Sequence, residues 1–206
     1  MFISEGGGGS GFEQAAIGTH VARCVKIIDI GTHKGDYQGQ VTIKRQVIIG
    51  WELPNELITK GEYAGKPFFC SKFYTASLNE KAALRADLTN WRTRDFTQEE
   101  LMRFDLKSIL DKACMISITR NDKDKSKVSG VMSLPKGMVC PDRVNDLVNF
   151  SLDEYDQNVF DLLSPGYKKM IMESPEYIQI HSPKHDYRNE SHGNTVIDAF
   201  DDDLPF

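Results

Sequence analysis

The chain has 206 residues, of which 40% are hydrophobic and 10% aromatic, enough to bury the core of one domain with tails or of two small domains. The net charge is −5 at pH 7. No apolar run approaches the length of a membrane span, and the start, MFISEGGGGSGFE, lacks the basic and apolar regions of a signal peptide. We therefore expect a cytoplasmic protein without membrane contact. Its four cysteines are irregularly spaced, which predicts reduced, mostly buried thiols.

The charge is unevenly distributed along the chain. Residues 18–140 hold 20 Lys and Arg against 14 Asp and Glu, whereas residues 141–186 hold 4 against 9 and residues 187–206 hold 1 against 5. A basic body is therefore flanked by acidic segments, a distribution that fits a nucleic-acid-binding protein. The basic surplus is modest and fits an ordinary solvated surface as well, so charge alone does not decide between the two.

The first half of the chain predicts three strands. Residues 1–11 are expected to form a flexible glycine-rich arm, and residues 12–180 the folded domain. Residues 17–30 are rich in β-branched side chains, residues 40–53 alternate until Pro54 ends the strand, and residues 66–77 form a third strand. The segment GTHKGDYQG, residues 31–39, predicts a loop between the first two strands.

Helical periodicity follows the third strand. Residues 80–92 predict a helix with Ser77 or Asn79 as its N-cap, Thr97 and Glu100 predict a capping box, and residues 105–111 predict one further turn. Strands return at residues 112–120 and 126–134, joined by the polar hairpin loop NDKDK.

This order predicts a mainly β fold, a five-stranded oligonucleotide-binding (OB) barrel with a helical insert between strands 3 and 4. Other small β-barrels share the strand count and remain alternatives. Residues 155–163 and 166–173 predict short C-terminal helices that pack on the barrel. Residues 181–206 predict a disordered linker and acidic tail.

The tail ends in DAFDDDLPF, residues 198–206, which combines an acidic run with an apolar end. A block of like charges is typical of a solvated, disordered segment, whereas a terminal Phe beside a carboxylate suits a basic, apolar-floored pocket on another protein. The end resembles the C-terminal tip of bacterial single-stranded-DNA-binding proteins, which recruits replication and repair enzymes in that family. The resemblance implies that the partner-binding residues are Asp198, Asp201, Asp202, Asp203, Leu204, Pro205 and Phe206.

A second set of short motifs lies in the body of the chain: Ile28–Thr32, the YTASL of residues 74–78, Lys81-Ala82, Trp91-Arg92, Phe104–Leu106 and Lys112–Cys114. Through these motifs, residues 12–175 resemble bacteriophage single-stranded-DNA-binding proteins. It implies binding and protection of single-stranded DNA, without sequence preference or catalysis, during phage DNA replication, recombination and repair in the host cytoplasm. The partners it implies are replication and recombination proteins of the polymerase, helicase, primase or nuclease class, and it leaves open whether the protein is a homo-oligomer.

Single-strand binding needs cations along the phosphates and rings on which bases stack. In OB barrels the face of strands 2 and 3, the first loop and the last hairpin provide them. We predict Tyr37, Phe73 and Tyr74 as stacking rings, with Trp51 as a further candidate, and assign Phe68, Phe69 and Trp91 to the core; by strand alternation, one of Phe73 and Tyr74 must face outward. The predicted phosphate-binding cations are Arg23, Lys26, Lys34, Lys44, Arg45, Lys72, Arg120, Lys125 and Lys127.

The sequence predicts no cofactor, metal site or catalytic site. His181, His185 and His192 lie in a polar linker without a cysteine partner, and no glycine loop for phosphates or nucleophile–base pair is present. Two alternatives to DNA binding remain. One is a protein-binding replication or recombination adaptor that does not contact DNA. The other is a nuclease that uses Asp201–Asp203, although metal sites normally hold carboxylates on rigid elements.

Overall fold

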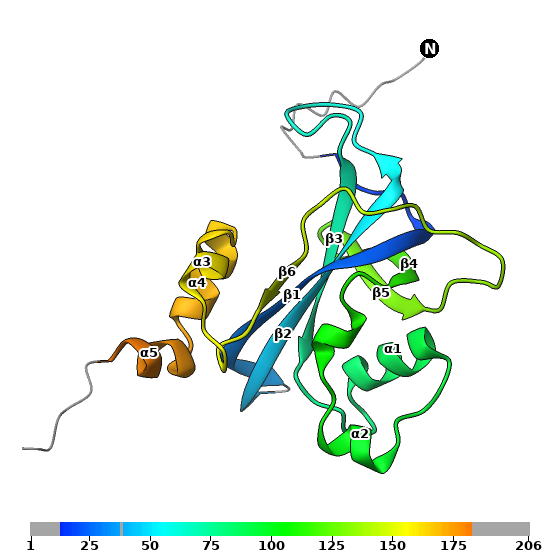
Figure 1. Ribbon diagram of the computed structural model, residues 1–206. Coiled ribbons are helices and arrows are strands. Elements are labelled where there is room, and N and C mark those ends of the chain that lie inside the picture. Colours follow the sequence, from blue (N-terminus) through cyan, green and yellow to red (C-terminus); the bar gives the residue numbers. More distant parts are fainter. Residues whose placement is uncertain (1–12, 38, 183–206) are drawn as a thin grey trace, which may run out of the picture.

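The chain folds around one sheet, and a computed structural model describes residues 13–37 and 39–182 (Figure 1). These residues form a mainly β protein with six strands and a few short helices, as the sequence predicts. The predicted arm of residues 1–11, the side chain of Tyr37 and residues 183–206 of the predicted linker and tail lie outside the described part. No described helix is both long and apolar enough to span a bilayer.

The long strand β1 joins the two halves of the sheet. The strands are β1 (Gly18–Tyr37), β2 (Gln40–Leu57), β3 (Pro67–Thr75), β4 (Ala113–Arg120), β5 (Ser126–Met132) and β6 (Val148–Phe150). Their order is β3-β2-β1-β4-β5, and the short β6 pairs with β1 in parallel. The first residues of β1 pair with β4 and the later ones with β2. The ladder does not close between β3 and β5, so the sheet is open there.

Two bulges bend β1 and let it change partners. The register with β2 shifts between Cys24 and Lys26 and again between Asp29 and Gly31. Gly31 has φ of 79°, and a Cβ at this position would lie 2.4 Å from Cβ of Ser174. Both the left-handed backbone and the close approach require glycine here.

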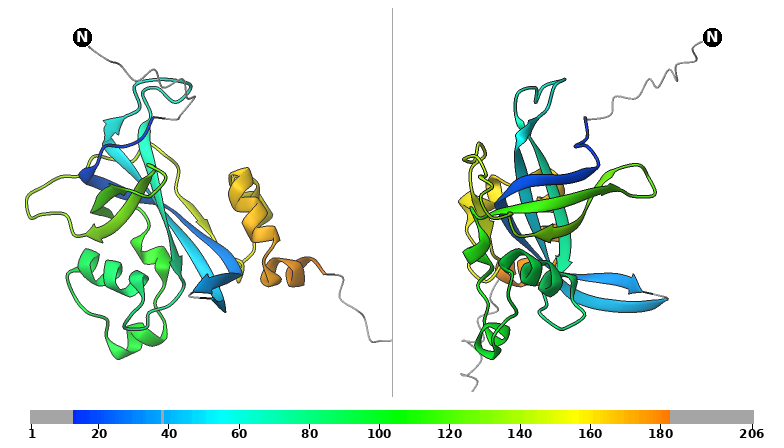
Figure 2. Two further views of the ribbon diagram at one scale, coloured as in Figure 1. Left: turned by 180° about the vertical axis from the view of Figure 1, so that it is seen from behind. Right: turned by 90° about the vertical axis from the view of Figure 1, so that its right-hand side faces the viewer.

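Beyond the bulges, β1 and β2 continue as a two-stranded ribbon, residues 31–37 and 40–46 (Figure 2, right). The predicted loop over residues 31–39 is therefore wrong, because pairing continues as far as Tyr37 and Gln40. Pro54 does not end β2 either. It lies where the β2–β3 register is irregular, between Leu53 and Leu57, and an irregular stretch tolerates the missing backbone donor.

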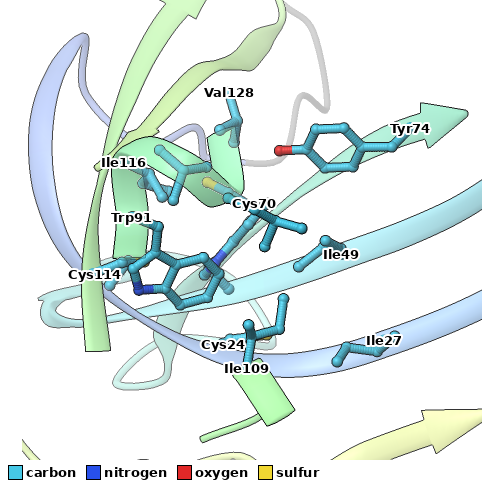
Figure 3. Packing of buried hydrophobic residues seen from close by; sticks show 14 of the residues in the cluster. Cys24, Ile27, Ile49, Cys70, Tyr74, Trp91, Ile109, Cys114, Ile116 and Val128 are labelled. Atoms are coloured by element: carbon cyan, nitrogen blue, oxygen red, sulfur yellow. The ribbon is translucent and has the colours of Figure 1, made fainter. Parts of the chain in front are cut away.

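The middle of the sheet is buried on both faces. All residues from Val47 to Leu53 are buried, with Ile49 and Trp51 in an inner core and Ile48 in an outer core. Figure 3 shows the inner core, where Trp91 packs among side chains of β1, β2, β3, β4 and β5. All four cysteines are buried free thiols, as predicted.

The helical insert closes one end of the inner core. It consists of α1 (Ala83–Arg92), α2 (Gln98–Met102) and the 3-10 helix η1 (Leu106–Ile109). The capping box of Thr97 and Glu100 is confirmed. The predicted cap of α1 is wrong, because the helix begins after Ala82, which makes no side-chain capping bond.

The C-terminal helices cover part of the outer face. They are α3 (Gln157–Asp161), α4 (Pro165–Met172) and α5 (Pro175–His181), and Figure 1 shows them together on one side of the sheet. Their apolar side chains pack over Ile28, Ile30 and Ile48. Glu176 accepts hydrogen bonds from the backbone N–H of Thr32, at 2.9 Å, and from its hydroxyl. The unpredicted α5 is thereby fixed to the base of the ribbon.

The N-terminal segment, residues 13–16, ties two loops together. Glu13 accepts from the backbone N–H of Thr59 at 2.8 Å, and Gln14 accepts from the N–H of Ser126 at 2.7 Å. The β2–β3 loop and the β4–β5 hairpin are thus linked through the same four residues.

Candidate nucleic-acid interface

Three rows of side chains cross β1, β2 and β3 on the outer face of the sheet. The registers place Lys26, Gly50 and Ser71 in the middle row. The row on one side contains Ile28, Ile48 and Phe73. The row on the other side contains Glu52 and Phe69. The middle row therefore has one aromatic ring of β3 on each side.

Neighbouring segments cover part of each flanking row but leave its β3 ring exposed. The C-terminal helices cover Ile28 and Ile48. The segment after Pro141 covers Glu52, whose carboxylate accepts from the backbone N–H groups of Val144 and Asn145, each at 2.8 Å. We call the remaining area the aromatic patch; it consists of the exposed rings of Phe69 and Phe73, the half-buried Lys26 and Ser71, and the buried Gly50.

Gly50 allows the ring of Phe69 to lie over the sheet. A Cβ on Gly50 would be 2.4 Å from Cζ of Phe69 and 3.3 Å from Cβ of Lys26. The ammonium of Lys26 lies 5.1 Å from the centroid of this ring, within the range of a cation–π contact. Because Phe69 is still 39% exposed, the patch combines an accessible ring with a positive charge.

The structure separates Phe73 from Tyr74, as strand alternation requires. Phe73 faces outward and is 48% exposed. Tyr74 is buried, and its hydroxyl donates to Asp87 at 2.7 Å. Trp51 is also buried in the inner core. The stacking roles predicted for Tyr74 and Trp51 therefore disagree with this structure, whereas that of Phe73 remains a prediction.

The sequence interpretation missed Phe69, which it assigned to the core. Strand alternation does indicate that one of these rings is exposed, because Phe68 and Phe69 are adjacent in a strand and must point to opposite faces. Phe68 is the buried member of the pair. The cross-strand register that brings Gly50 under the ring could not be derived from the sequence pattern.

Four of the predicted phosphate-binding cations are held by the protein itself. Lys72 lies 2.6 Å from a carboxylate oxygen of Asp87, and the other three are arginines that bind carbonyl or carboxylate oxygens. These contacts are Arg23 with the carbonyls of Asp111, Cys140 and Pro141, Arg45 with Asp29 and Asp153, and Arg120 with the carbonyl of Ala15. These contacts give the four side chains structural roles, and their contacts with DNA remain predictions.

Of the five remaining predicted cations, Lys26 lies in the aromatic patch and the other four are on two hairpins. Lys34 and Lys44 are exposed on the ribbon, and Lys125 and Lys127 on the β4–β5 hairpin. No ion pair joins these four side chains to other described residues. The ribbon and the β4–β5 hairpin extend from the same side of the molecule (Figure 2, right). The two hairpins can thus contribute positive charge to one surface.

The described residues give little support to a metal site or to another kind of ligand site. No group of three or more His, Cys, Asp or Glu side chains there could hold a metal ion. His181 stacks on Tyr177 with ring centroids 4.0 Å apart, while His185, His192 and the aspartates of the tail lie outside the described residues. A polar cavity of about 390 Å³ beside Arg23 is lined by charged groups, among which Arg143 pairs with Asp111 at 3.2 Å.

Comparison with known proteins does not assign a family. No protein-family model matches the chain, and no curated protein matches it.

Proposed function

We propose that the protein binds single-stranded DNA, without sequence preference and without catalysis, on an OB fold. The strand order supports the fold, because β1 pairs with both β2 and β4 and α1 lies between β3 and β4. The open seam is narrow, since Nζ of Lys72 on β3 lies 3.4 Å from the carbonyl oxygen of Ser129 on β5. A partly open five-stranded barrel is the form in which OB folds occur.

The observation that supports binding most directly is the aromatic patch. Its two exposed rings are on β3, with Lys26 beside one of them, on the strand 2–3 face that OB folds use. The two lysine-bearing hairpins are those that follow strands 1 and 4, which also contact the ligand in OB folds. Stacking on an aromatic ring provides about 1–3 kcal/mol per base and accepts any base. Bases paired inside a duplex cannot reach such rings, so we expect a preference for single strands.

Fluorescence anisotropy with labelled oligo-dT, a mixed-sequence single strand and a duplex of equal length tests this proposal. We expect tight, salt-sensitive binding to both single strands and weak binding to the duplex. Phe69→Ala and Phe73→Ala should each weaken single-strand binding roughly 5- to 150-fold, the equivalent of one lost stack. Tyr63→Ala is the matched control, because its ring is exposed on the β2–β3 loop and does not belong to the patch.

Three results would count against this function. Equal affinity for the duplex would contradict single-strand recognition, and unchanged affinity of both Phe variants would exclude the patch. If the protein bound neither nucleic acid, the protein-binding adaptor would be the better interpretation.

We further propose that the protein acts in DNA replication, recombination and repair and recruits partner proteins through Asp198–Phe206. The sequence resemblances support this role. The acidic segment can also compete with DNA for the lysines of the hairpins, since opposite charges attract over a Debye length of about 8 Å at physiological salt. Deleting residues 195–206 should then tighten DNA binding at low salt and abolish capture of replication enzymes. Unchanged affinity of the shortened chain at low salt would contradict the competition.

A further inference from the structure

The ribbon projects from the sheet and has few contacts that could set its direction (Figure 2, right). β3 pairs with β2 only from Gln46 onward, while β4 pairs with β1 only up to Arg23 and β6 only up to Ile28. Beyond Gln46, the described strands of the ribbon therefore form a ladder only with each other. A lone two-stranded hairpin is marginally stable in water, and a bulge between Asp29 and Gly31 bends β1 where the ribbon starts. Contacts at the base must therefore fix its direction.

Two residues at the start of α5 make such contacts with β1. Ser174, the buried N-cap of α5, lies against Gly31, where a Cβ would be 2.4 Å from the serine Cβ. Glu176, in the first turn of α5, accepts hydrogen bonds from the backbone N–H of Thr32, at 2.9 Å, and from its hydroxyl. Both contacts come directly after the second bulge of β1. The ribbon cannot turn about this bulge without breaking them.

An arginine links the other strand of the ribbon to the C-terminal part of the chain. The guanidinium of Arg45 pairs with Asp29 of β1 and lies 2.9 Å from the carboxylate of Asp153, between β6 and α3. Asp153 is largely exposed, and an exposed ion pair contributes little. Glu176 is half-buried and receives two hydrogen bonds, one of them from the backbone. Of the two links from the ribbon to the C-terminal segments, that of Glu176 is therefore the stronger.

We propose that Glu176 is a positioning residue, which directs the ribbon so that Lys34 and Lys44 reach the phosphates of a bound single strand. What these lysines bind rests on the proposed function, whereas the positioning of the ribbon does not. Both lysines are exposed, and both lie on the ribbon beyond the contacts at its base. A ribbon that is already fixed presents them without losing conformational freedom when DNA binds, which is the general advantage of a preorganised site.

Residual dipolar couplings of backbone N–H groups test the positioning in the absence of DNA. In the natural protein, the amides of Lys34 and Ile43 should fit the same molecular alignment as those of the sheet. Glu176→Ala removes both acceptors, so the ribbon couplings should shrink relative to those of the sheet as the ribbon samples several directions. Glu176→Gln should restore much of them, because its amide oxygen still accepts from the N–H of Thr32. Glu173→Ala, at an exposed glutamate at the end of α4, is the matched control.

Titration of the same variants with oligo-dT tests the effect on binding. We expect Glu176→Ala to lower the slope of log affinity against log salt by about 0.7 for each ribbon lysine that loses its phosphate. Phe69→Ala should weaken binding by the same factor in the natural and the Glu176→Ala backgrounds, because stacking on the sheet does not depend on the ribbon. A general loss of structure would change both quantities.

Two results would overturn the inference. Equal couplings in Glu176→Ala and the natural protein would show that Glu176 does not direct the ribbon, and shrunken couplings with an unchanged salt slope would show that its direction does not affect binding. If the natural protein did not bind oligo-dT, the proposed function would be wrong, and the couplings alone would still decide whether Glu176 directs the ribbon. Thr32→Val, which removes only the hydroxyl donor, replaces Glu176→Ala if thermal unfolding shows that the latter does not fold.

Discussion

Asp87 of α1 and Tyr74 of β3 are joined by a buried hydrogen bond of 2.7 Å, donated by the tyrosine hydroxyl. The same carboxylate oxygen lies 2.6 Å from Nζ of Lys72, and the other accepts from the N–H of Val131 at 3.4 Å. Val131 is on β5, so one carboxylate connects the two strands between which no ladder forms. Burial and the neighbouring Asp87 carboxylate both raise the pKa of Tyr74, which keeps the hydroxyl a donor.

Removing this carboxylate should strongly destabilise the fold. In Asp87→Ala the ammonium of Lys72 and the buried hydroxyl of Tyr74 lose their acceptor, and breaking a buried pair costs about 3–5 kcal/mol. Urea denaturation measures the loss in the free energy of unfolding. Asp95→Ala, at an exposed aspartate near the end of the same helix, should stay within about 0.5 kcal/mol of the natural protein. Equal stability of the two variants would contradict the bridging role.

The salt dependence of DNA binding should distinguish free lysines from bound ones. Each lysine that contacts a phosphate contributes about 0.7 to the slope of log affinity against log salt for single strands. Lys34→Ala, Lys44→Ala and Lys127→Ala should each lower the slope by about that amount. Lys72→Ala should leave it unchanged, because Asp87 holds this ammonium. A full reduction in the slope for Lys72→Ala would show that it does bind phosphate.

A methyl group at Gly50 should disturb the aromatic patch. In Gly50→Ala the ring of Phe69 must move, because the new Cβ would lie 2.4 Å from its Cζ. We expect weaker single-strand binding in the same anisotropy assay. Gly130→Ala is the control, since a Cβ there meets no atom within 4 Å. In a Phe69→Ala background, Gly50→Ala should not weaken single-strand binding further. A further loss of affinity would show that the new methyl group acts on a residue other than Phe69.

Glu100 should make part of the stability of the fold sensitive to acid. The hydrogen bond from the Arg94 guanidinium and then that from the Thr97 N–H lower the pKa of Glu100 from 4.5 to about 2. A carboxylate with a lowered pKa stabilises the folded state above pH 4.5, and this contribution is lost as the pH falls towards 2. Glu100→Gln should therefore be less stable than the natural protein at pH 7, with a difference that shrinks below pH 4.5.

Thermal unfolding at a series of pH values measures this difference. Glu99→Gln, at an exposed neighbour in α2, should show no such trend. A difference for Glu100→Gln that stayed constant down to pH 2 would exclude the ionised carboxylate as its cause.

Periodicity and capping patterns predicted most of the fold, because they depend on neighbours in the sequence. Both hairpin strands, β4 and β5, and the capping box at Thr97 follow from such local signals. The ribbon was missed because Gly31, Gly35 and Gly39 favour a loop locally, while the ladder between β1 and β2 stabilises a strand. The three-residue β6 has too little sequence to show a period.

The candidate site was harder to predict than the fold. Residue type alone does not show that Asp29 and Asp153 hold Arg45 while Lys44, next to it, is exposed. Nor does it show that Tyr167, nearly a hundred residues after Ser71, reaches the same patch. Such features depend on contacts between distant segments, and periodicity contains no information about these contacts.

The four buried thiols have a practical consequence for spectroscopy. Burial raises the pKa of Cys24 to about 12 and that of Cys70 to about 11, and it also raises the pKa of the other two, Cys114 and Cys140. Because the thiolate is the reactive form, maleimide dyes should leave all four unmodified in the folded protein. A cysteine introduced on the ribbon and another on the β4–β5 hairpin could then be labelled selectively. Energy transfer between the two dyes would report directly whether the hairpins close around a strand.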